Sequence, residues 1–237
     1  LAPRGHASAQ LAAGLLGAGM LWFGWFGFNA GSALPAGSTA AVALINTQVC
    51  TAAAALSSVA VERWRDGHAT TLGVASGAVV GAVAVTRACA FLTPIGAIAL
   101  GLVAGAVCAV AVGWKYRLGY DDSLDVVGVH GVGGVIGMLS IGILATTSVN
   151  AAGKDGLLAG GGLSLLGRQV VAVLATAAFA FTMTLLLAWL VNRTMGFRAE
   201  PEDEMRGLDV AQHAESAYEF GATTGIGMLS GTHPGRE

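Results

Sequence analysis

Long apolar stretches, each bounded by glycine, proline or charged residues, constrain the fold of this chain more than any other feature. A helix that crosses a bilayer needs about 20 predominantly apolar residues. Six segments meet this criterion, at residues 10–34, 38–61, 71–90, 94–113, 125–147 and 169–191. None alternates apolar and polar residues as a barrel strand does, and lipid offers no partner to free backbone groups. The sequence therefore predicts an all-α polytopic bundle over residues 1–191, followed by a polar tail at 192–237.

The scarcity of charge supports lipid as the solvent and narrows the functional classes. Apolar side chains make up 54% of the 237 residues and charged ones 11%, whereas soluble domains carry about 25% charged residues. A net charge of −2 supplies no basic field to hold nucleic acid. The three cysteines form no spaced pair for a metal or a disulfide framework, and no catalytic triad or nucleotide loop occurs. We expect no enzyme activity, no metal and no cofactor.

The distribution of lysine and arginine predicts the orientation in the membrane, because basic residues in short loops stay on the cytoplasmic side. With the N-terminal segment inside, nine of the 12 basic residues lie inside: Arg4, Arg63, Arg65, Lys115, Arg117, Arg193, Arg198, Arg206 and Arg236. The outer side receives Arg87, Lys154 and Arg168. We therefore expect both termini, and the tail, to lie in the cytoplasm.

Glycine pairs of the GxxxG type occur in four of the apolar segments, at residues 27 and 31, 77 and 81, 101 and 105, and 133 and 137. This spacing lets two helix backbones approach closely in a bilayer. The pairs predict a tightly packed bundle, with contacts either inside one subunit or between subunits.

Two polar residues in the fifth segment are candidates for chemistry. An ionisable group inside a span costs about 2.5 to 3.5 kcal/mol, so His130 is by default a functional hypothesis. Asp125 lies five residues before it, at the cytoplasmic start of the segment. The structural alternatives are a helix N-cap or a first-turn carboxylate favoured by the helix dipole for Asp125, and a core histidine bonded to a backbone carbonyl for His130.

Aromatic residues gather in the first segment. An interfacial belt is the simpler interpretation for Trp22, Phe23 and Phe26. Phe28 and Ser32 are four residues apart and so share a helix face, which places a ring beneath a hydroxyl near the outer mouth. An aromatic face attracts a cation, and a hydroxyl oxygen accepts a hydrogen bond from an ammonium-like donor.

The residues Gly24–Ser32 (GWFGFNAGS) resemble a signature of the ammonium transporter family (Amt/Mep, related to Rh proteins). Four further stretches agree with the family in its order, namely Ala43–Thr47 (ALINT), Thr71–Gly77 (TLGVASG), Gly119–Gly134 (GYDDSLDVVGVHGVGG) and Pro201–Tyr218 (PEDEMRGLDVAQHAESAY). The resemblance implies an eleven-helix fold of two inverted five-helix repeats plus a final helix, assembled as a homotrimer in the plasma membrane. This chain resembles the second repeat and the last helix. Because it begins at Leu1 rather than at a methionine, we expect a fragment of a longer protein or a gene model that lacks its start.

The resemblance also implies roles for individual residues. Phe28 resembles one of two stacked gate phenylalanines, Ser32 the hydroxyl of the outer recruitment site, and Trp25 a residue of the pore wall. His130 resembles one of two paired pore histidines, and Asp125 the carboxylate that supports the start of its helix. The other gate phenylalanine and the other histidine belong to the half that is not in this sequence.

One stretch departs from the family. In Thr86–Ala90, Arg87 replaces the family's usual proline and Ala90 its glycine, which predicts an altered outer turn. The functional expectation is transport of ammonium, recruited at the outer site, deprotonated, and passed as ammonia through a hydrophobic pore that contains His130. The alternatives are an ammonium sensor that signals through its tail to a cytoplasmic regulatory protein, and a truncated, non-conducting fragment.

Overall fold

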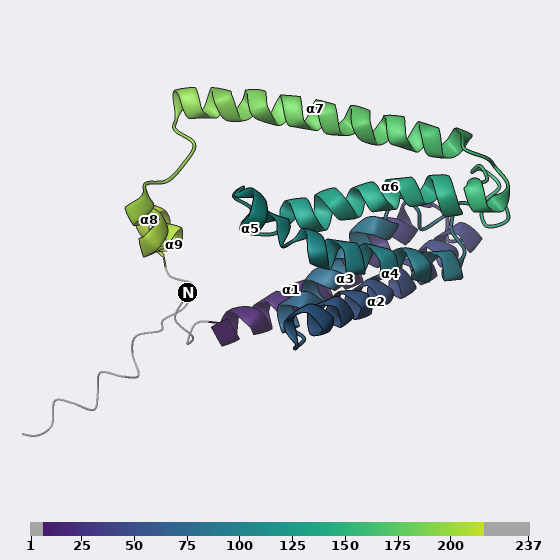
Figure 1. The fold of residues 1–237 in the computed structure, drawn as a ribbon, viewed down its shortest axis with the longest axis horizontal. Coiled ribbons are helices and arrows are strands. Elements are labelled where there is room, and N and C mark those ends of the chain that lie inside the picture. The colour runs from purple at the N-terminus through teal and green to yellow at the C-terminus, as the bar shows by residue number, and fades with distance from the viewer. Residues whose placement is uncertain (1–6, 216–237) are drawn as a thin grey trace, which may run out of the picture. The chain divides into compact units, whose positions relative to one another are not determined.

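The computed structural model describes residues 7–215, and all regular elements in this range are helices (Figure 1). They are α1 (Ala7–Gly31), α2 (Ser38–Asp66), α3 (Thr71–Val85), α4 (Pro94–Ala111), α5 (Trp114–Leu118), η1 (Val127–Gly131), α6 (Val132–Leu144), η2 (Leu157–Ala159), α7 (Ser164–Thr194), α8 (Pro201–Arg206) and α9 (Leu208–His213). The chain divides into two compact units, Leu1–Ala177 and Ala178–Glu237. The first unit carries the helical bundle.

Local sequence signals set several helix ends. Thr70 caps α3, because its hydroxyl accepts the backbone N–H of Gly73, and Thr93 caps α4 in the same way through Gly96. Pro94 occupies the first turn of α4, where its missing N–H costs nothing. Gly67 ends α2 in the left-handed conformation with φ of 80°, which a glycine adopts without steric penalty.

Among the described residues, five helices are long and apolar enough to cross a membrane: Leu11–Gly31, Ser38–Asp66, Pro94–Leu118, Val127–Leu144 and Ser164–Thr194. The third predicted segment, 71–90, contains a shorter helix, because α3 ends at Val85 and residues 86–93 form a turn. We call these residues the α3–α4 turn. The first helix also ends earlier than predicted, since α1 stops at Gly31 and the backbone turns toward Pro35.

Small residues bring α3 and α4 against α2. A Cβ atom at Gly81 would lie 2.6 Å from the Cα atom of Thr51, and one at Gly101 would collide with the Cys50 carbonyl oxygen. The GxxxG pairs of α3 and α4 therefore allow close contacts between helices of this same chain. Gly137 of α6 does the same against the backbone of Ala84. A Cβ atom at Gly27 or Gly31 in α1 would meet no atom of another described element within 4 Å.

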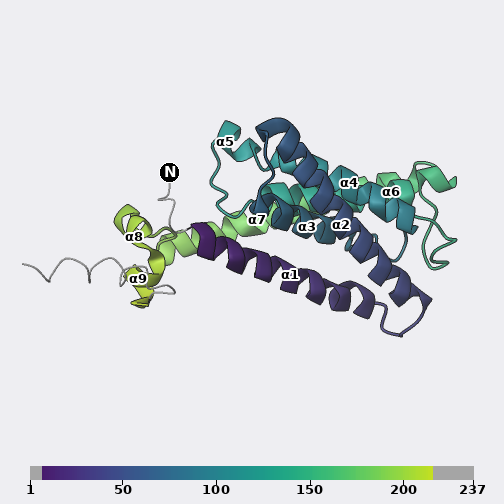
Figure 2. The ribbon, with the colours of Figure 1, turned by 90° about the horizontal axis from the view of Figure 1, so that it is seen from below.

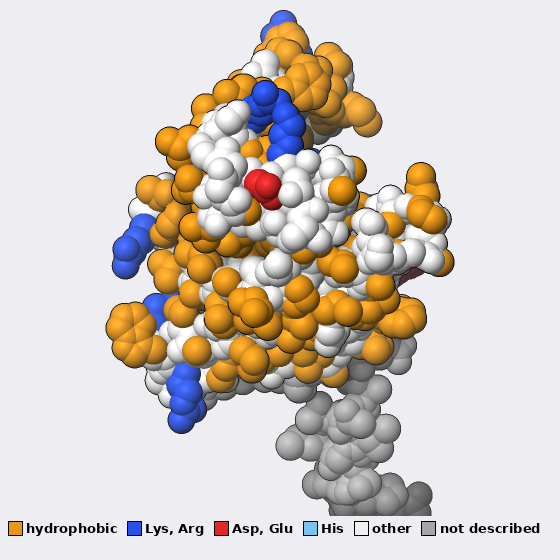
Figure 3. All heavy atoms as spheres, turned by 90° about the vertical axis from the view of Figure 1, so that its right-hand side faces the viewer, with side chains coloured by type: hydrophobic (Ala, Val, Ile, Leu, Met, Phe, Trp, Pro, Cys, Tyr) orange, Lys and Arg blue, Asp and Glu red, His pale blue; other side chains and the backbone are white. Residues whose placement is uncertain are grey.

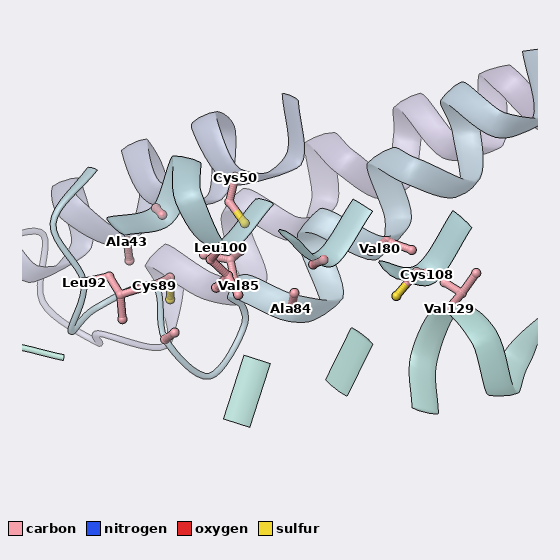
Figure 4. Packing of buried hydrophobic residues seen from close by; sticks show 13 residues of the cluster. Ala43, Cys50, Val80, Ala84, Val85, Cys89, Leu92, Leu100, Cys108 and Val129 are labelled. Carbon is pink, nitrogen blue, oxygen red and sulfur yellow. The ribbon is translucent and has the colours of Figure 1, made fainter. Parts of the chain in front are cut away.

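The buried core lies between α2, α3, the α3–α4 turn, α4 and η1 (Figure 4). Its members are small or branched: Ala43, Cys50, Val80, Ala84, Val85, Ala88, Cys89, Leu92, Ala97, Leu100, Ala104, Cys108 and Val129. Such residues allow helices to pack closely. All three cysteines are free thiols buried in the bundle, as packing residues are expected to be. Helix α1 lies along α2 and α3 (Figure 2).

Much of the molecular surface is apolar. Large hydrophobic side chains such as Leu16, Phe23 and Leu158 are exposed, by 67%, 78% and 73%. Figure 3 shows hydrophobic side chains spread over one face, with lysine and arginine side chains among them. A soluble monomer rarely exposes so much contiguous apolar surface. The first unit therefore has the surface of a protein that is surrounded by lipid or by further helices.

The second unit contains the end of α7 and the two short helices α8 and α9. These two helices lie in the segment that the sequence predicts as a polar tail, and α7 itself extends to Thr194. The predictions for Arg4, Arg236 and residues 216–218 of the tail motif lie outside the described residues.

Candidate functional site

The C-terminal end of α1 carries Trp25 and Phe28. Their spacing of three places them on neighbouring positions of one helix face. The ring centroids lie 6.4 Å apart and the ring planes meet at 67°, an edge-to-face arrangement that aromatic pairs favour. Phe28 is 64% exposed, so the described residues leave most of this ring uncovered.

The α3–α4 turn fixes the indole of Trp25. Its Nε1–H donates to the hydroxyl oxygen of Thr86 at 2.7 Å, and this hydroxyl donates to the carbonyl oxygen of Ala82 at 2.6 Å. Trp25 and Thr86 are 61 residues apart in sequence, and no pattern in the sequence links them. Because the indole is held by a hydrogen bond as well as by packing, the aromatic pair has a defined orientation.

Ser32 lies just beyond the last residue of α1, in a turn instead of on the predicted helix face. Its hydroxyl donates to the carbonyl oxygen of Phe28. The hydroxyl proton is therefore engaged, and the lone pairs of the oxygen remain available as acceptors. An acceptor oxygen that is directed by the backbone of Phe28 suits a ligand that donates hydrogen bonds.

Two buried asparagines hold this end of the bundle together. Asn29 donates through Nδ2 to the hydroxyl of Thr47 at 2.9 Å, which ties α1 to α2. Asn46 donates to the carbonyl oxygens of Cys89 and Leu92, both at 2.7 Å, which ties α2 to the α3–α4 turn. Asn46 belongs to the motif ALINT and Asn29 to the motif GWFGFNAGS, but the motifs alone predicted no role for either residue. Their presence inside apolar spans was the signal that could have found them.

The position of the Trp22 indole contradicts the interpretation of this residue as part of an interfacial aromatic belt. Its indole nitrogen is enclosed and has no hydrogen-bond partner among the described residues. A belt tryptophan keeps its N–H at the wet interface. The belt interpretation is therefore wrong for Trp22, whereas Phe23 has the exposed ring that it requires.

His130 lies in η1, a single turn of π-helix at the start of α6. π-helical turns are rare in proteins, and those that occur are often found at functional sites. The His130 side chain is exposed and has no hydrogen-bond partner among residues 7–215. Among the described residues, no backbone carbonyl holds the His130 ring as the core-histidine alternative would require.

Asp125 precedes η1 but does not cap it with its side chain. The carboxylate of Asp122 accepts the backbone N–H groups of Val126 and Val127, at 2.8 and 2.9 Å. Asp125 has a left-handed backbone, with φ of 58°, and its carboxylate accepts a hydrogen bond from Lys115 at 2.6 Å. The N-cap interpretation of Asp125 is corrected accordingly, because Asp122 supplies the capping oxygens.

The described residues do not close a conduit around the predicted site. No hydrogen bond or ring contact between described residues joins Trp25, Phe28 or Ser32 to His130. A hollow of about 70 Å³ is lined by Leu11, Gly14, Leu15, Thr71, Leu72 and Ala75, none of which is a predicted site residue. Residues 7–215 contain no cluster of His, Cys, Asp or Glu that could hold a metal ion.

Long apolar helices, an apolar exterior and polar residues inside the spans define a multi-pass helical membrane protein. Residues 3–218 match the model of the Ammonium Transporter Family, and the chain belongs to this family. The family consists of transporters rather than enzymes.

Curated relatives agree over most of the chain. It is 48% identical to an ammonium transporter of Mycobacterium tuberculosis over 216 residues, which are 89% of this chain and 45% of the relative. An ammonium transporter of Bacillus subtilis is 45% identical over 205 residues, 86% of this chain and 50% of the relative. The chain therefore spans about half the length of these relatives.

Solved structures share the fold. Mep2 of Candida albicans superimposes with a TM-score of 0.75 at 32% identity, over 83% of this chain and 45% of that one. A structure described as a Sensor Amt Protein gives a TM-score of 0.75 at 34% identity, over 83% and 48% of the two chains. The described helices thus align with part of the Amt/Mep fold.

Proposed function

We propose that this chain supplies one half of an ammonium-conducting pore, corresponding to the second repeat and final helix of the Amt/Mep fold. The observation that carries the proposal is the match to the family over residues 3–218, together with coverage of 45% of a 48% identical ammonium transporter. The exposed rings of Phe28 and His130 fit this arrangement, because a second half of the pore would cover them.

Recruitment of ammonium takes place at the end of α1. The Ser32 oxygen accepts a hydrogen bond from the cation, since its own proton is donated to Phe28. The face of a neighbouring aromatic ring adds about 2 kcal/mol of cation–π attraction when the site is desolvated. Trp25 supports the Phe28 ring edge-on and is itself anchored to Thr86.

Deprotonation follows from the cost of carrying charge into a dry pore. Idealised desolvation of an ammonium ion costs on the order of 20 kcal/mol, and several kcal/mol after relaxation. With the lysine ammonium as a proxy, giving up a proton at neutral pH costs about 5 kcal/mol. One aromatic contact cannot offset the desolvation, so loss of the proton is the cheaper route.

His130 then meets the neutral molecule or the separated proton. A neutral imidazole has one donor and one acceptor nitrogen, so it can hydrogen-bond ammonia or relay a proton. Its position in a π-helical turn, with no hydrogen-bond partner among the described residues, leaves both nitrogens free for this task. The protein works in the plasma membrane as a homotrimer with its C-terminus in the cytoplasm, where a regulatory protein binds the tail.

The test is uptake of labelled methylammonium and proton-coupled current in cells that express the complete coding sequence. The substitution His130→Leu should abolish the proton-coupled current. The matched control is His68→Ala, which changes an exposed histidine between α2 and α3 and should leave the current unchanged. An unaltered current in His130→Leu removes His130 from the mechanism, and absence of uptake by the parent protein refutes transport.

A second candidate is an ammonium sensor that signals through its tail. The structure described as a Sensor Amt Protein is 34% identical to this chain, which favours this candidate. Removing residues 201–237 separates the two functions, because a transporter keeps uptake while a sensor loses its cellular response to ammonium. A chain that supports neither uptake nor response is the non-conducting fragment.

A further inference from the structure

Lys115 connects the short helix α5 to the start of the His130 helix. Its ammonium group donates to the carboxylate of Asp125 at 2.6 Å and to the backbone carbonyl oxygen of Asp122 at 2.9 Å. One side chain thus bridges two residues of the segment that leads into η1. We call Lys115, Asp122 and Asp125 the lysine clamp.

Each aspartate of the lysine clamp is joined to the turn that contains His130. The carboxylate of Asp122 accepts the N–H groups of Val126 and Val127, and the carbonyl oxygen of Asp125 accepts the N–H of Val129 at 2.8 Å. Lys115 therefore holds both residues that supply the first hydrogen-bond acceptors of this helix. The left-handed backbone of Asp125 is compatible with this arrangement, since aspartate tolerates it better than most residues.

Burial distinguishes this ion pair from the pair that Arg65 forms. The Lys115 and Asp125 side chains are 14% and 21% exposed, against 45% and 41% for Arg65 and Asp66. The attraction within an enclosed ion pair is screened less by water. Removing one partner of such a pair therefore destabilises the protein more. The same region is packed tightly, because a Cβ atom at Gly128 would lie 2.9 Å from a methyl carbon of Val112.

We infer that Lys115 is a positioning residue for His130, acting through Asp122 and Asp125 on the π-helical turn Val127–Gly131. This inference rests on the proposed function for its effect on transport, but the effect on the turn itself is independent of transport. Nothing in the sequence distinguishes Lys115 from its neighbour Arg117 on α5, since both are basic residues of a short loop.

Hydrogen–deuterium exchange of the purified protein in lipid nanodiscs tests the inference. In Lys115→Met, the amides of residues 126–131 should exchange about tenfold faster, while those of 133–144 should not change. Lys115→Arg retains the charge and should return exchange to within about twofold of the parent. Arg117→Gln, at an exposed residue of the same helix, is the matched control and should leave exchange unchanged.

The double variant Lys115→Met/Asp125→Asn separates positioning from a failure to fold. Because it removes both charges, residues 133–144 should exchange as in the parent, with only 126–131 faster. Unchanged exchange at 126–131 in Lys115→Met, or equal acceleration throughout α6, overturns the inference.

Transport provides the second measurement. Lys115→Met should lower the maximal rate of methylammonium uptake about tenfold and leave its half-saturating concentration unchanged, because the recruiting residues lie in and just after the last turn of α1. If the parent protein takes up no methylammonium, the proposed function fails, and the exchange result alone decides the role of Lys115. Faster exchange at 126–131 with normal uptake overturns the link to transport.

Discussion

Helices α2 and α7 have similar lengths, 29 and 31 residues, and both are apolar enough to cross a membrane, but their surroundings differ. Nine residues of α2 are buried, whereas none of α7 is. The difference comes from the neighbours, because glycines of α3 and α4 let their backbones reach α2. Length and hydropathy thus define a span, and small residues on the facing helices decide which span becomes the centre of the bundle.

The largest effect is expected from filling one of these contacts. Gly101→Leu would drive a side chain into the carbonyl of Cys50, where only backbone movement could accommodate it. We expect a loss of about 3 kcal/mol in stability, or failure to insert, because overpacking costs about 1 to 3 kcal/mol and this contact is against backbone atoms. Thermal unfolding of the protein in nanodiscs measures the change.

The matched control lies on α7. Gly167→Leu adds the same side chain where no atom would lie within 4 Å of the new Cβ atom, so the unfolding temperature should stay nearly the same. Equal losses for the two variants would show that α7 is packed as tightly as α2 in the membrane, and would remove the contrast between them.

A smaller effect is expected from the polar contacts of the two helices. Asn46→Ala leaves the carbonyl oxygens of Cys89 and Leu92 without their donors inside the bundle, at a cost of about 2 to 4 kcal/mol. Gln169→Ala on α7 should cost little, because the side-chain carbonyl oxygen of Gln169 has no partner to lose among the described residues. Chemical denaturation measures the free energy of unfolding of each variant. A loss of stability in Gln169→Ala as large as that in Asn46→Ala would contradict the expected difference.

The smallest effect concerns the segment between α6 and α7. Hydrogen bonds from the backbone and hydroxyl of Thr147 hold the pKa of Asp155 below its ordinary value. Since the folded state favours the ionised form, this stabilisation is fully present above the unfolded pKa and is lost as pH falls through the folded one. Proteolysis of residues 145–163 should therefore accelerate below about pH 4.

The variant Asp155→Asn isolates this carboxylate. At neutral pH its segment 145–163 should be cleaved faster than the parent's, and the difference should vanish in acid, where Asp155 is protonated. A pH response of the same size in Asp155→Asn would assign the effect to another group.

Apolar runs and glycine spacing were sufficient to predict an all-helical membrane bundle, and five motifs were sufficient to predict its family, because lipid leaves the backbone few alternatives. These patterns were insufficient for helix ends that depend on turns. Segment 71–90 stops at Val85 because the α3–α4 turn is held by hydrogen bonds from Asn46, a residue of another helix. Trp25 and Thr86 likewise meet only through tertiary structure.

The sequence located Trp25, Phe28, Ser32, Asp125 and His130 without showing how they are supported. Periodicity assumes 3.6 residues per turn, so it could not predict the π-helical turn at His130. A helix cap was one structural alternative for Asp125, but the left-handed backbone of Asp125 and the capping role of the Asp122 carboxylate are seen only in the structure. Their roles in transport stay predictions.

The central claim is that Phe28 and His130 border one ammonium pathway, and an experimental structure of the complete protein in lipid tests it most directly. The proposal predicts that the rings of both residues face the same narrow channel, covered by helices from the other half of the protein. A His130 ring that faces the acyl chains, or a Phe28 ring in a separate cavity, would contradict it.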